Sequence, residues 1–424
     1  MLERRALLTV VQLTAAASPV VLRPISPLNQ PFAVKVSQVR PVTIAGSVTD
    51  SQNVTPTLGG DAIANVEALS SVSRTLNFRL TVRDNRPYVP GSTTHEYDKM
   101  FVAAVTPYKP GTEDIDEVAF RNYMRYWAQP KFIGAGGAML VSPEAGEAFY
   151  LTQDEKLRLA EIALAELGDK TVVFSGVMQT TTRACIEEAR ALKKLGVHGL
   201  FLMPPIGTID IVAAWDSQKN PEVWIDQLKE IADAVNLPVI IHPTGGKFFA
   251  LPLESGMKTV DAVPQIVGYK MITQDFDDMA RALRAYTKRH VAILPAGANN
   301  MPTAIKNGWF DGTVSGSWNY AMEKTVDAIV AERDQKDPAK AEKLWGDGLM
   351  ALHRTVTNSD KGYRLHSAYK LCTWMRGLIP NPFLRAPQRR LPVDQVVELR
   401  DALKAAHYDV IPDSEIRKAY PSLS

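Results

Sequence analysis

The stretch Gln265-Ile266-Val267-Gly268-Tyr269-Lys270-Met271-Ile272 decides the fold, because it is a short apolar run that carries a single lysine. Its length, the preceding Pro264 and the polar residues 273–275 that follow it predict a strand covered on both faces. Strands of this kind form parallel sheets, and in a closed barrel of parallel strands the functional groups gather at the C-terminal strand ends. We therefore expect Lys270 to lie at such a strand end.

A buried lysine at this place has a chemical use. Burial disfavours an ammonium group, and a neutral amine can attack a ketone to form a Schiff base. The alternative is a lysine whose stem lies along the strand while its amine reaches solvent. This stretch alone leaves both interpretations of Lys270 open.

From Phe101 onward, short apolar runs alternate with helical patterns, as repeated βα units do. Apolar periodicity predicts helices over Gln153 to Glu166 and over Thr181 to Leu195. A further helix is expected to have Asn220 as its N-cap and Pro221 at its first position. Strands are expected near residues 101–106, 132–141, 171–176, 199–203, 238–242, 265–270, 291–295 and 312–316. These eight units predict an α/β fold, a (β/α)8 TIM barrel over residues 99–335.

The regions on either side of the barrel differ from it. Residues 1–98 contain alternating runs such as Phe32 to Val39 and Leu76 to Arg83, which predict a β-rich or irregular extension, or a disordered one. Residues 336–424 are expected to form a helical region packed on the barrel or used in an oligomer contact. Its predicted helical segments run from Pro338 to Thr357, from Asp360 to Leu378 and from Val393 to His407.

The composition excludes several classes of function. A net charge of +2 with 22% charged residues indicates neither a nucleic-acid surface nor a polybasic membrane patch. No run approaches the roughly 18 apolar residues that a transmembrane helix needs. The two cysteines, Cys185 and Cys372, lack CxxC spacing, so we expect no disulfide framework. The N-terminus imitates an export signal only loosely, and a cytoplasmic protein is expected.

The histidines argue against a metal-dependent hydrolase. The sequence has seven histidines without an HxH pair, and no group of metal ligands follows the predicted strands. We therefore expect neither a metal nor another cofactor.

Several motifs follow one another along the predicted barrel. They are Val105-Thr106-Pro107, Gly146-Glu147 followed by Leu151-Thr152 and Glu155-Lys156, Leu195-Gly196-Val197-His198-Gly199, Leu237-Pro238-Val239-Ile240-Ile241 and Val267-Gly268-Tyr269-Lys270. Together they resemble the dihydrodipicolinate synthase and N-acetylneuraminate lyase family, the class I pyruvate-type aldolases and dehydratases. The resemblance covers about residues 100–410 and implies a TIM barrel, a small carbonyl substrate and a homodimer or homotetramer.

The resemblance assigns roles by position. Lys270 matches the Schiff-base lysine of the family, and His242 falls where the family has a proton-shuttling tyrosine. A histidine could also carry protons, with a pKa nearer neutrality, or could be merely structural. The family loop that holds the substrate carboxylate falls on Glu144, Ala145 and Gly146. Both threonines of that loop are absent, which makes the chain an atypical member.

Two further positions are expected to bind substrate. Lys247 lies where many members have an arginine for an acidic group of the second substrate, although a solvated lysine is an equal alternative. Ser315, with Ser317 and Asn319, follows the eighth predicted strand and could hydrogen-bond a substrate carboxylate or hydroxyl.

The sequence thus favours a Schiff-base-forming lyase, an aldolase or a dehydratase, that acts on a 2-oxo acid or a related small carbonyl compound through Lys270. The alternative is a non-catalytic barrel that binds a small acid or serves as an assembly subunit. In that case Lys270 would form no imine.

Overall fold

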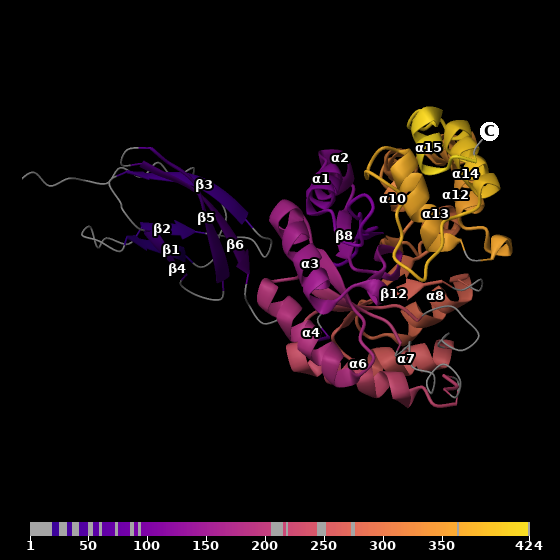
Figure 1. The fold of residues 1–424 in the computed structure, drawn as a ribbon. Coiled ribbons are helices and arrows are strands. Elements are labelled where there is room, and N and C mark those ends of the chain that lie inside the picture. Colours follow the sequence, from indigo (N-terminus) through magenta and orange to yellow (C-terminus); the bar gives the residue numbers. More distant parts are fainter. Residues whose placement is uncertain are drawn as a thin grey trace, which may run out of the picture. The chain divides into compact units, whose positions relative to one another are not determined.

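The chain divides into two compact units, which are described separately (Figure 1). The larger comprises Val89–Leu167 and Val172–Ser424, and the smaller comprises Met1–Tyr88 with the short Gly168–Thr171 segment. The position of the domain boundary near residue 98 stays a prediction. The computed structural model describes residues 89–91, 95–204, 215–217, 219–243, 252–272, 276–362 and 364–422, and the backbone of six strands before them.

The described residues of the smaller unit before residue 89 lie in strands, as a β-rich extension would have them, and its assignment as a domain stays a prediction. Its strands form a sheet in the order β2-β1-β4 and a second in the order β3-β6-β5, and the strand pairs in both are antiparallel. β6 contains the alternating run Leu76 to Arg83 that predicted a strand. The strands are β1 (Pro19–Pro24), β2 (Phe32–Lys35), β3 (Val42–Thr49), β4 (Val54–Leu58), β5 (Ala62–Val72) and β6 (Thr75–Asp84).

Eight parallel strands among the described residues of the larger unit confirm the predicted TIM barrel. Hydrogen-bonded neighbours follow the order β13-β12-β11-β10-β9-β8-β7-β14. Each of these strands is buried along its whole length, which explains why its sequence is a continuous apolar run. The strands are β7 (Met100–Ala103), β8 (Gly137–Val141), β9 (Val173–Val177), β10 (Gly199–Leu202), β11 (Val239–Ile241), β12 (Ile266–Met271), β13 (Ala292–Pro295) and β14 (Thr313–Ser315).

The seam between β13 and β14 is joined by a side chain. The backbone N–H of Asp311 donates to the Ile293 carbonyl oxygen (3.2 Å), and Asp311 Oδ2 accepts from the N–H of Ile293 (2.7 Å). Arg284 pairs with the same carboxylate oxygen at 2.7 Å. The Asp311 carboxylate therefore accepts a hydrogen bond that a backbone carbonyl of β14 would accept in a regular sheet. Because this contact joins β13 to the residues before β14, the barrel is nearly closed.

The helices between the strands follow the predicted periodicity. Thr181 caps α4 by accepting from the Ala184 N–H (3.2 Å), and Gly196 ends this helix with a left-handed φ of 89°. The helices that connect the barrel strands are α1 (Glu117–Trp127), α2 (Pro130–Gly134), α3 (Gln153–Leu167), α4 (Thr182–Leu195), α6 (Glu222–Val235), α7 (Leu253–Ala262), α8 (Phe276–Tyr286) and α9 (Met301–Lys306).

Two local predictions were wrong. Residues 132–134, expected as the start of a strand, belong to α2, because Pro130 begins a helical turn that places the Phe132 ring 5.0 Å from that of Trp127. Pro221, and not Asn220, caps α6, since the carbonyl of Pro221 accepts the N–H groups of Trp224 and Ile225 at 3.1 Å. This helix consequently begins one residue later than predicted.

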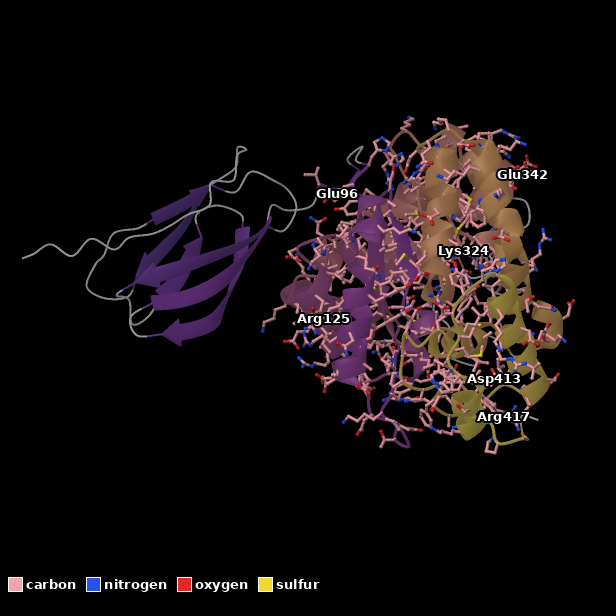
Figure 2. The ribbon with its side chains drawn as sticks, turned by 90° about the horizontal axis from the view of Figure 1, so that it is seen from above. Glu96, Arg125, Lys324, Glu342, Asp413 and Arg417 are labelled. Atoms are coloured by element: carbon pink, nitrogen blue, oxygen red, sulfur yellow. The ribbon has the colours of Figure 1, made fainter. Side chains whose placement is uncertain are left out.

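Helices after the barrel form the group coloured orange to yellow in Figure 1. α13 lies against α10, against α14 and against the turn that follows β8. Asp413 ties α15 to α14 through Lys404 (3.2 Å) and Arg400 (3.3 Å), and Figure 2 marks it at the edge of this group. The helices are α10 (Trp318–Arg333), α11 (Pro338–Leu344), α12 (Met350–Val356), α13 (Leu365–Met375), α14 (Val393–Ala405) and α15 (Asp413–Ala419).

The sequence predicted neither a disulfide framework nor a transmembrane helix. Cys185 and Cys372 are free and buried in the part of the chain that the structure describes. Within the same residues, no helix is both long enough and apolar enough to cross a membrane.

His353 is a titratable group inside the contact between α12 and α10. The residue is fully buried, and its Nδ1 shares a hydrogen bond of 2.9 Å with the Tyr320 hydroxyl. Burial lowers the pKa of His353 from 6.5 to about 3. As the pH falls through that interval, the unfolded chain binds a proton that the folded chain does not, so the free energy of unfolding decreases.

We expect His353→Asn to weaken the loss of stability on acidification. One such proton contributes up to about 1.4 kcal/mol per pH unit below pH 6.5, and the variant lacks it. Melting temperatures measured between pH 4.5 and 8 should therefore fall less steeply than in the wild type. Tyr320→Phe removes the same hydrogen bond but keeps the imidazole, so it should keep the wild-type slope. Equal slopes for both variants would contradict this account.

Candidate functional site

Lys270 lies at the C-terminal end of β12, where the sequence placed it. Its side chain is 8% exposed, and its Nζ is 2.8 Å from Oε1 of Glu144. The Phe201 ring of β10 lies under the amine, with its centroid 5.4 Å from Nζ. The amine is thus enclosed by one aromatic wall and one carboxylate, and does not extend freely into solvent.

Glu144 connects Lys270 to His242. It belongs to the short turn Glu144–Gly146 that follows β8, and its Oε1 contacts both Lys270 Nζ and His242 Nε2. Burial by itself would raise the pKa of Glu144, but the adjacent His242 and Lys270 outweigh it and hold the pKa well below 4.5. Its second oxygen, Oε2, has no hydrogen-bond partner within the described residues. Glu144 is consequently ionised at neutral pH.

His242 follows β11 and presents a neutral imidazole. Burial lowers its pKa to about 4, although the Glu144 carboxylate opposes this shift. The neutral ring therefore donates from Nε2 to Glu144, and Nδ1 is left as an acceptor. Nδ1 is buried without a hydrogen-bond partner in the described part of the chain. His242 thus has one nitrogen available for proton transfer.

The turn after β8 is held in a narrow set of conformations. Ser142 and Glu147, which flank the turn, have left-handed φ angles of 50° and 65°. Gly146 is required because a Cβ there would lie 2.6 Å from the Ala104 carbonyl oxygen. The Thr106 hydroxyl donates to the Gly146 carbonyl at 2.7 Å. These constraints, with Ala145 buried beneath, direct the side chain of Glu144 toward Lys270.

Glu147 anchors the same turn to the C-terminal region. Its carboxylate is 2% exposed and pairs with the Lys370 amine of α13. The other oxygen accepts from the Tyr108 hydroxyl (3.2 Å), the Arg385 backbone N–H (3.2 Å) and Gln388 Nε2 (2.8 Å). A single buried carboxylate therefore joins the barrel to two C-terminal segments.

A cavity of about 280 Å³ opens beside Glu144. Part of its wall comes from the C-terminal region and not from the barrel strands. Its lining residues are Glu144, Phe149, Tyr150, Gly362, Arg364, Leu365, His366, Ser367 and Gln388. The sequence did not predict Arg364 or His366 as site residues, because no local pattern marks a helical segment after a barrel as part of its site.

Both missed residues have unusual surroundings. Burial lowers the pKa of His366, partly against the effect of Glu144, so this ring is a second neutral imidazole near the ionised carboxylate. Arg364 is 2% exposed and reaches Glu398 through Nη1 at 3.0 Å. The structure thus adds a buried guanidinium and an imidazole to the predicted residues.

Among the described residues, no contact joins Ser315 or Asn319 to Lys270. Ser315 is buried, and its hydroxyl oxygen accepts from the Ser317 backbone N–H at 3.1 Å. Asn319 binds the N–H of Val105 and the Tyr123 hydroxyl through Oδ1, and two backbone carbonyls through Nδ2. Asn319 is therefore structural. Lys247 lies outside the described residues.

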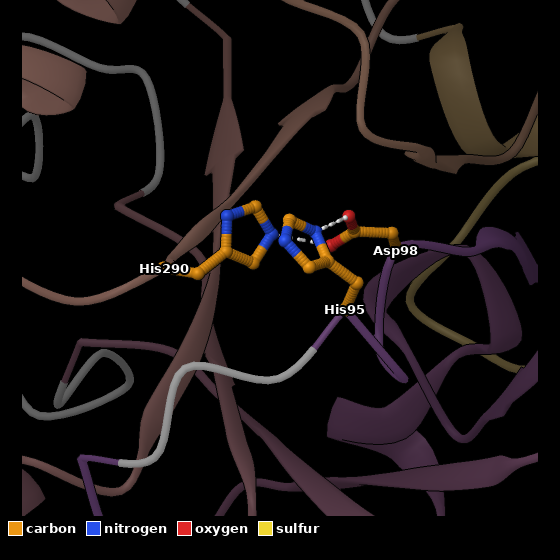
Figure 3. Close-up of side chains that lie close together, drawn as sticks. All are labelled: His95, Asp98 and His290. Carbon is orange, nitrogen blue, oxygen red and sulfur yellow. Dashed lines mark hydrogen bonds and ion pairs between the residues drawn. The ribbon is translucent and has the colours of Figure 1, made fainter.

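Three side chains at the opposite strand ends offer metal-ligating atoms. His95 Nδ1 and His290 Nε2 contact the Asp98 carboxylate at 2.8 and 2.7 Å, before β7 and β13 begin (Figure 3). Such a set suits Zn²⁺. Arg284 Nη1, however, lies 3.3 Å from His290 Nδ1 and can only donate, so His290 carries its proton on Nε2. The cluster therefore joins two strand starts by hydrogen bonds and takes no part in chemistry at Lys270.

Comparisons with known proteins agree on one family. A model described as the dihydrodipicolinate synthetase family matches residues 96–406. A 4-hydroxy-tetrahydrodipicolinate synthase of Acidothermus cellulolyticus is 26% identical over 330 residues, which cover 74% of this chain and 93% of that protein. A trans-2'-carboxybenzalpyruvate hydratase-aldolase of a Nocardioides species is 26% identical over 272 residues, which cover 63% of this chain and 76% of that protein.

Solved structures show the same fold. Dihydrodipicolinate synthase from Aquifex aeolicus has a TM-score of 0.62 at 19% identity and covers 74% of this chain and 99% of its own. YagE from Escherichia coli, solved in complex with pyruvate, has a TM-score of 0.63 at 18% identity with the same coverages. At these identities the likeness concerns the fold alone.

We expect Glu147→Gln to destabilise the larger unit strongly, because it leaves the buried Lys370 amine without a counter-charge. Breaking a buried ion pair from one side costs about 3–5 kcal/mol, whereas removing both charges costs much less. The double variant Glu147→Gln/Lys370→Met should therefore recover most of the melting temperature lost in the single variant. Tyr108→Phe removes one neutral hydrogen bond to the same carboxylate and should have a small effect. A double variant no more stable than Glu147→Gln would contradict the pairing.

Proposed function

The chain belongs to the dihydrodipicolinate synthetase family, and we propose that it is a Schiff-base-forming lyase acting on a 2-oxo acid or related small carbonyl compound. The observation that carries the proposal is Lys270, a buried amine at a barrel strand end with Glu144 at 2.8 Å and His242 on the same carboxylate oxygen. The hydratase-aldolase relative and the pyruvate complex of YagE support a carbonyl substrate.

Lys270, paired with Glu144, acts as the nucleophile after one of its ammonium protons passes to His242 Nδ1. The amine attacks the carbonyl carbon and a C–N bond forms. One amine proton and the proton held by His242 go to the carbonyl oxygen, which leaves as water, so that a protonated imine remains. Glu144, which stays ionised, stabilises the positive charge of this imine at Nζ. A bond from the carbon next to the imine carbon to one of its substituents then breaks. Its electron pair is delocalised into the protonated imine.

Two neutral imidazoles supply the proton transfers. His242 Nδ1 is available to accept a proton from the substrate and to return it later. His366 lines the cavity beside Glu144 and is also neutral at neutral pH. In this mechanism Glu144 stabilises the charge of the imine, and the two histidines transfer the protons that a tyrosine transfers in other members of the family.

Glu144 also influences which carbonyl compounds fit. It stands where the family loop has a threonine that holds the carboxylate next to the reacting carbonyl. Here the same position is an anion 2.8 Å from the lysine amine. Since like charges at close range repel, the site favours substrates without a carboxylate at the family's usual place.

We expect sodium borohydride to trap a reduced adduct on Lys270 when the protein is incubated with pyruvate, other 2-oxo acids or small aldehydes. Intact mass and peptide mapping would locate the adduct. Lys270→Arg keeps a cation beside Glu144 but cannot form the imine, so it should give no adduct. Lys258→Arg alters an exposed lysine of α7 and should react like the wild type. Folded protein that gains no mass from any compound would contradict the proposed function.

Glu144→Thr restores the hydroxyl of the family loop and removes the repulsion of a neighbouring carboxylate. We expect the pyruvate concentration that half-saturates trapping to fall at least tenfold, while that for a neutral aldehyde changes little. An unchanged or higher value for pyruvate would show that Glu144 does not oppose this carboxylate.

A further inference from the structure

We propose that Arg364 forms a binding site for a carboxylate of the substrate that is remote from the carbonyl carbon attacked by Lys270. This inference rests on the proposed function and narrows its substrate class to carbonyl compounds with a distal carboxylate. It arises from Arg364, one of the residues that line the cavity beside Glu144.

The guanidinium of Arg364 has unused hydrogen-bonding capacity. Its side chain is 1% exposed, and only Nη1 meets an acceptor, Glu398 Oε2 at 3.0 Å. Nε and Nη2 are buried and have no partner among the residues described. Buried donors without an acceptor cost free energy, and charged ones cost more than neutral ones. The unpaired edge of Arg364 is therefore unfavourable unless a ligand occupies it.

The free edge has the geometry that a carboxylate requires. The Nε and Nη2 groups of an arginine point two N–H bonds in parallel, which matches the two oxygens of a carboxylate. Lysine cannot reproduce this fork. The shape of the unused donors thus selects a planar anion.

The charge around Arg364 is incompletely compensated. Glu398 is 36% exposed and is shared between Arg364 and Lys361, whose Nζ lies 3.9 Å from the same oxygen. One carboxylate therefore faces two cations at this place. The remaining positive charge is available to an anionic ligand.

The cavity brings Arg364 together with the carboxylate that contacts the reacting amine. Glu144 and Arg364 line the same space of about 280 Å³, one from the turn after β8 and the other from the start of α13, and Glu144 Oε1 lies 2.8 Å from Lys270 Nζ. Glu144 Oε2 is a buried acceptor that also lacks a partner within the described residues. A small molecule with a carboxylate for Arg364 and a hydroxyl or protonated imine for Glu144 would satisfy both.

A carboxylate fits this arrangement better than a phosphate does. A phosphate carries nearly two negative charges at neutral pH, and Glu144 already places one anion in the cavity. A carboxylate beside the carbonyl would meet the same Glu144 charge at short range. A carboxylate several bonds away avoids it and still reaches Arg364.

The test compares 4-oxobutanoate with its methyl ester, two aldehydes of which only the first has a charged distal group. We expect the acid to half-saturate borohydride trapping at a concentration about 10- to 100-fold lower than the ester in the wild type. Arg364→Met should abolish this preference, and Arg364→Lys should retain part of it. Glu398→Gln removes the neighbouring carboxylate but leaves the guanidinium, so it controls for the lost ion pair and should keep the preference.

A second measurement separates this inference from the proposed function. Succinate is titrated calorimetrically into Lys270→Arg, which forms no imine, and into Lys270→Arg/Arg364→Met. Succinate that binds to Lys270→Arg but not to Lys270→Arg/Arg364→Met supports the carboxylate site, even if no compound is ever trapped. Equal half-saturation by acid and ester, with adducts formed on Lys270, would overturn the carboxylate site and leave the lyase standing. Inorganic phosphate binding more tightly than succinate would overturn the choice of carboxylate.

Discussion

The buried carboxylate of Glu147 is the interaction on which the arrangement of the larger unit depends. It accepts hydrogen bonds from Tyr108 after β7, from Lys370 on α13, and from Arg385 and Gln388 in the segment that follows α13. A charge at 2% exposure is tolerated only where donors surround it. The carboxylate therefore keeps all its hydrogen bonds only when the C-terminal segments pack on the barrel in this one position.

The candidate site inherits its geometry from that constraint. Glu144 lies three residues before Glu147, in a turn with a left-handed residue on each side. His366 precedes Lys370 by one helical turn of α13, so the ion pair of Lys370 also sets where His366 lies. Both walls of the cavity are thus positioned by one buried ion pair, although neither Glu147 nor Lys370 touches the lysine that would react.

The sequence predicted the parts of this molecule that local patterns determine. Continuous apolar runs indicated the barrel strands, and they placed Lys270 at the end of β12. Phe132 was assigned to a strand because apolar content alone does not distinguish a strand from a short buried helix that begins at a proline.

The site was only partly accessible to such reasoning. Glu144 was identified by its place in the loop, but its orientation toward Lys270 depends on backbone angles that no pattern reveals. Asn319 follows a strand end as a ligand would, yet all its hydrogen bonds go to the fold. Arg364 and His366 come from a segment outside the barrel repeats, and only packing through Glu147 brings them near.

The distribution of charge in the site follows a consistent logic. Where the family loop offers a hydroxyl, this chain has an ionised carboxylate, and in the proposed mechanism that anion stabilises a protonated imine better than a neutral group would. The same anion weakens the binding of a carboxylate next to the imine. Under the proposed mechanism, such a site binds the carboxylate of an acidic substrate elsewhere, and Arg364, which has two unpaired donors, lines the same cavity. The proposal therefore treats Glu144 and Arg364 as two parts of one change in substrate recognition.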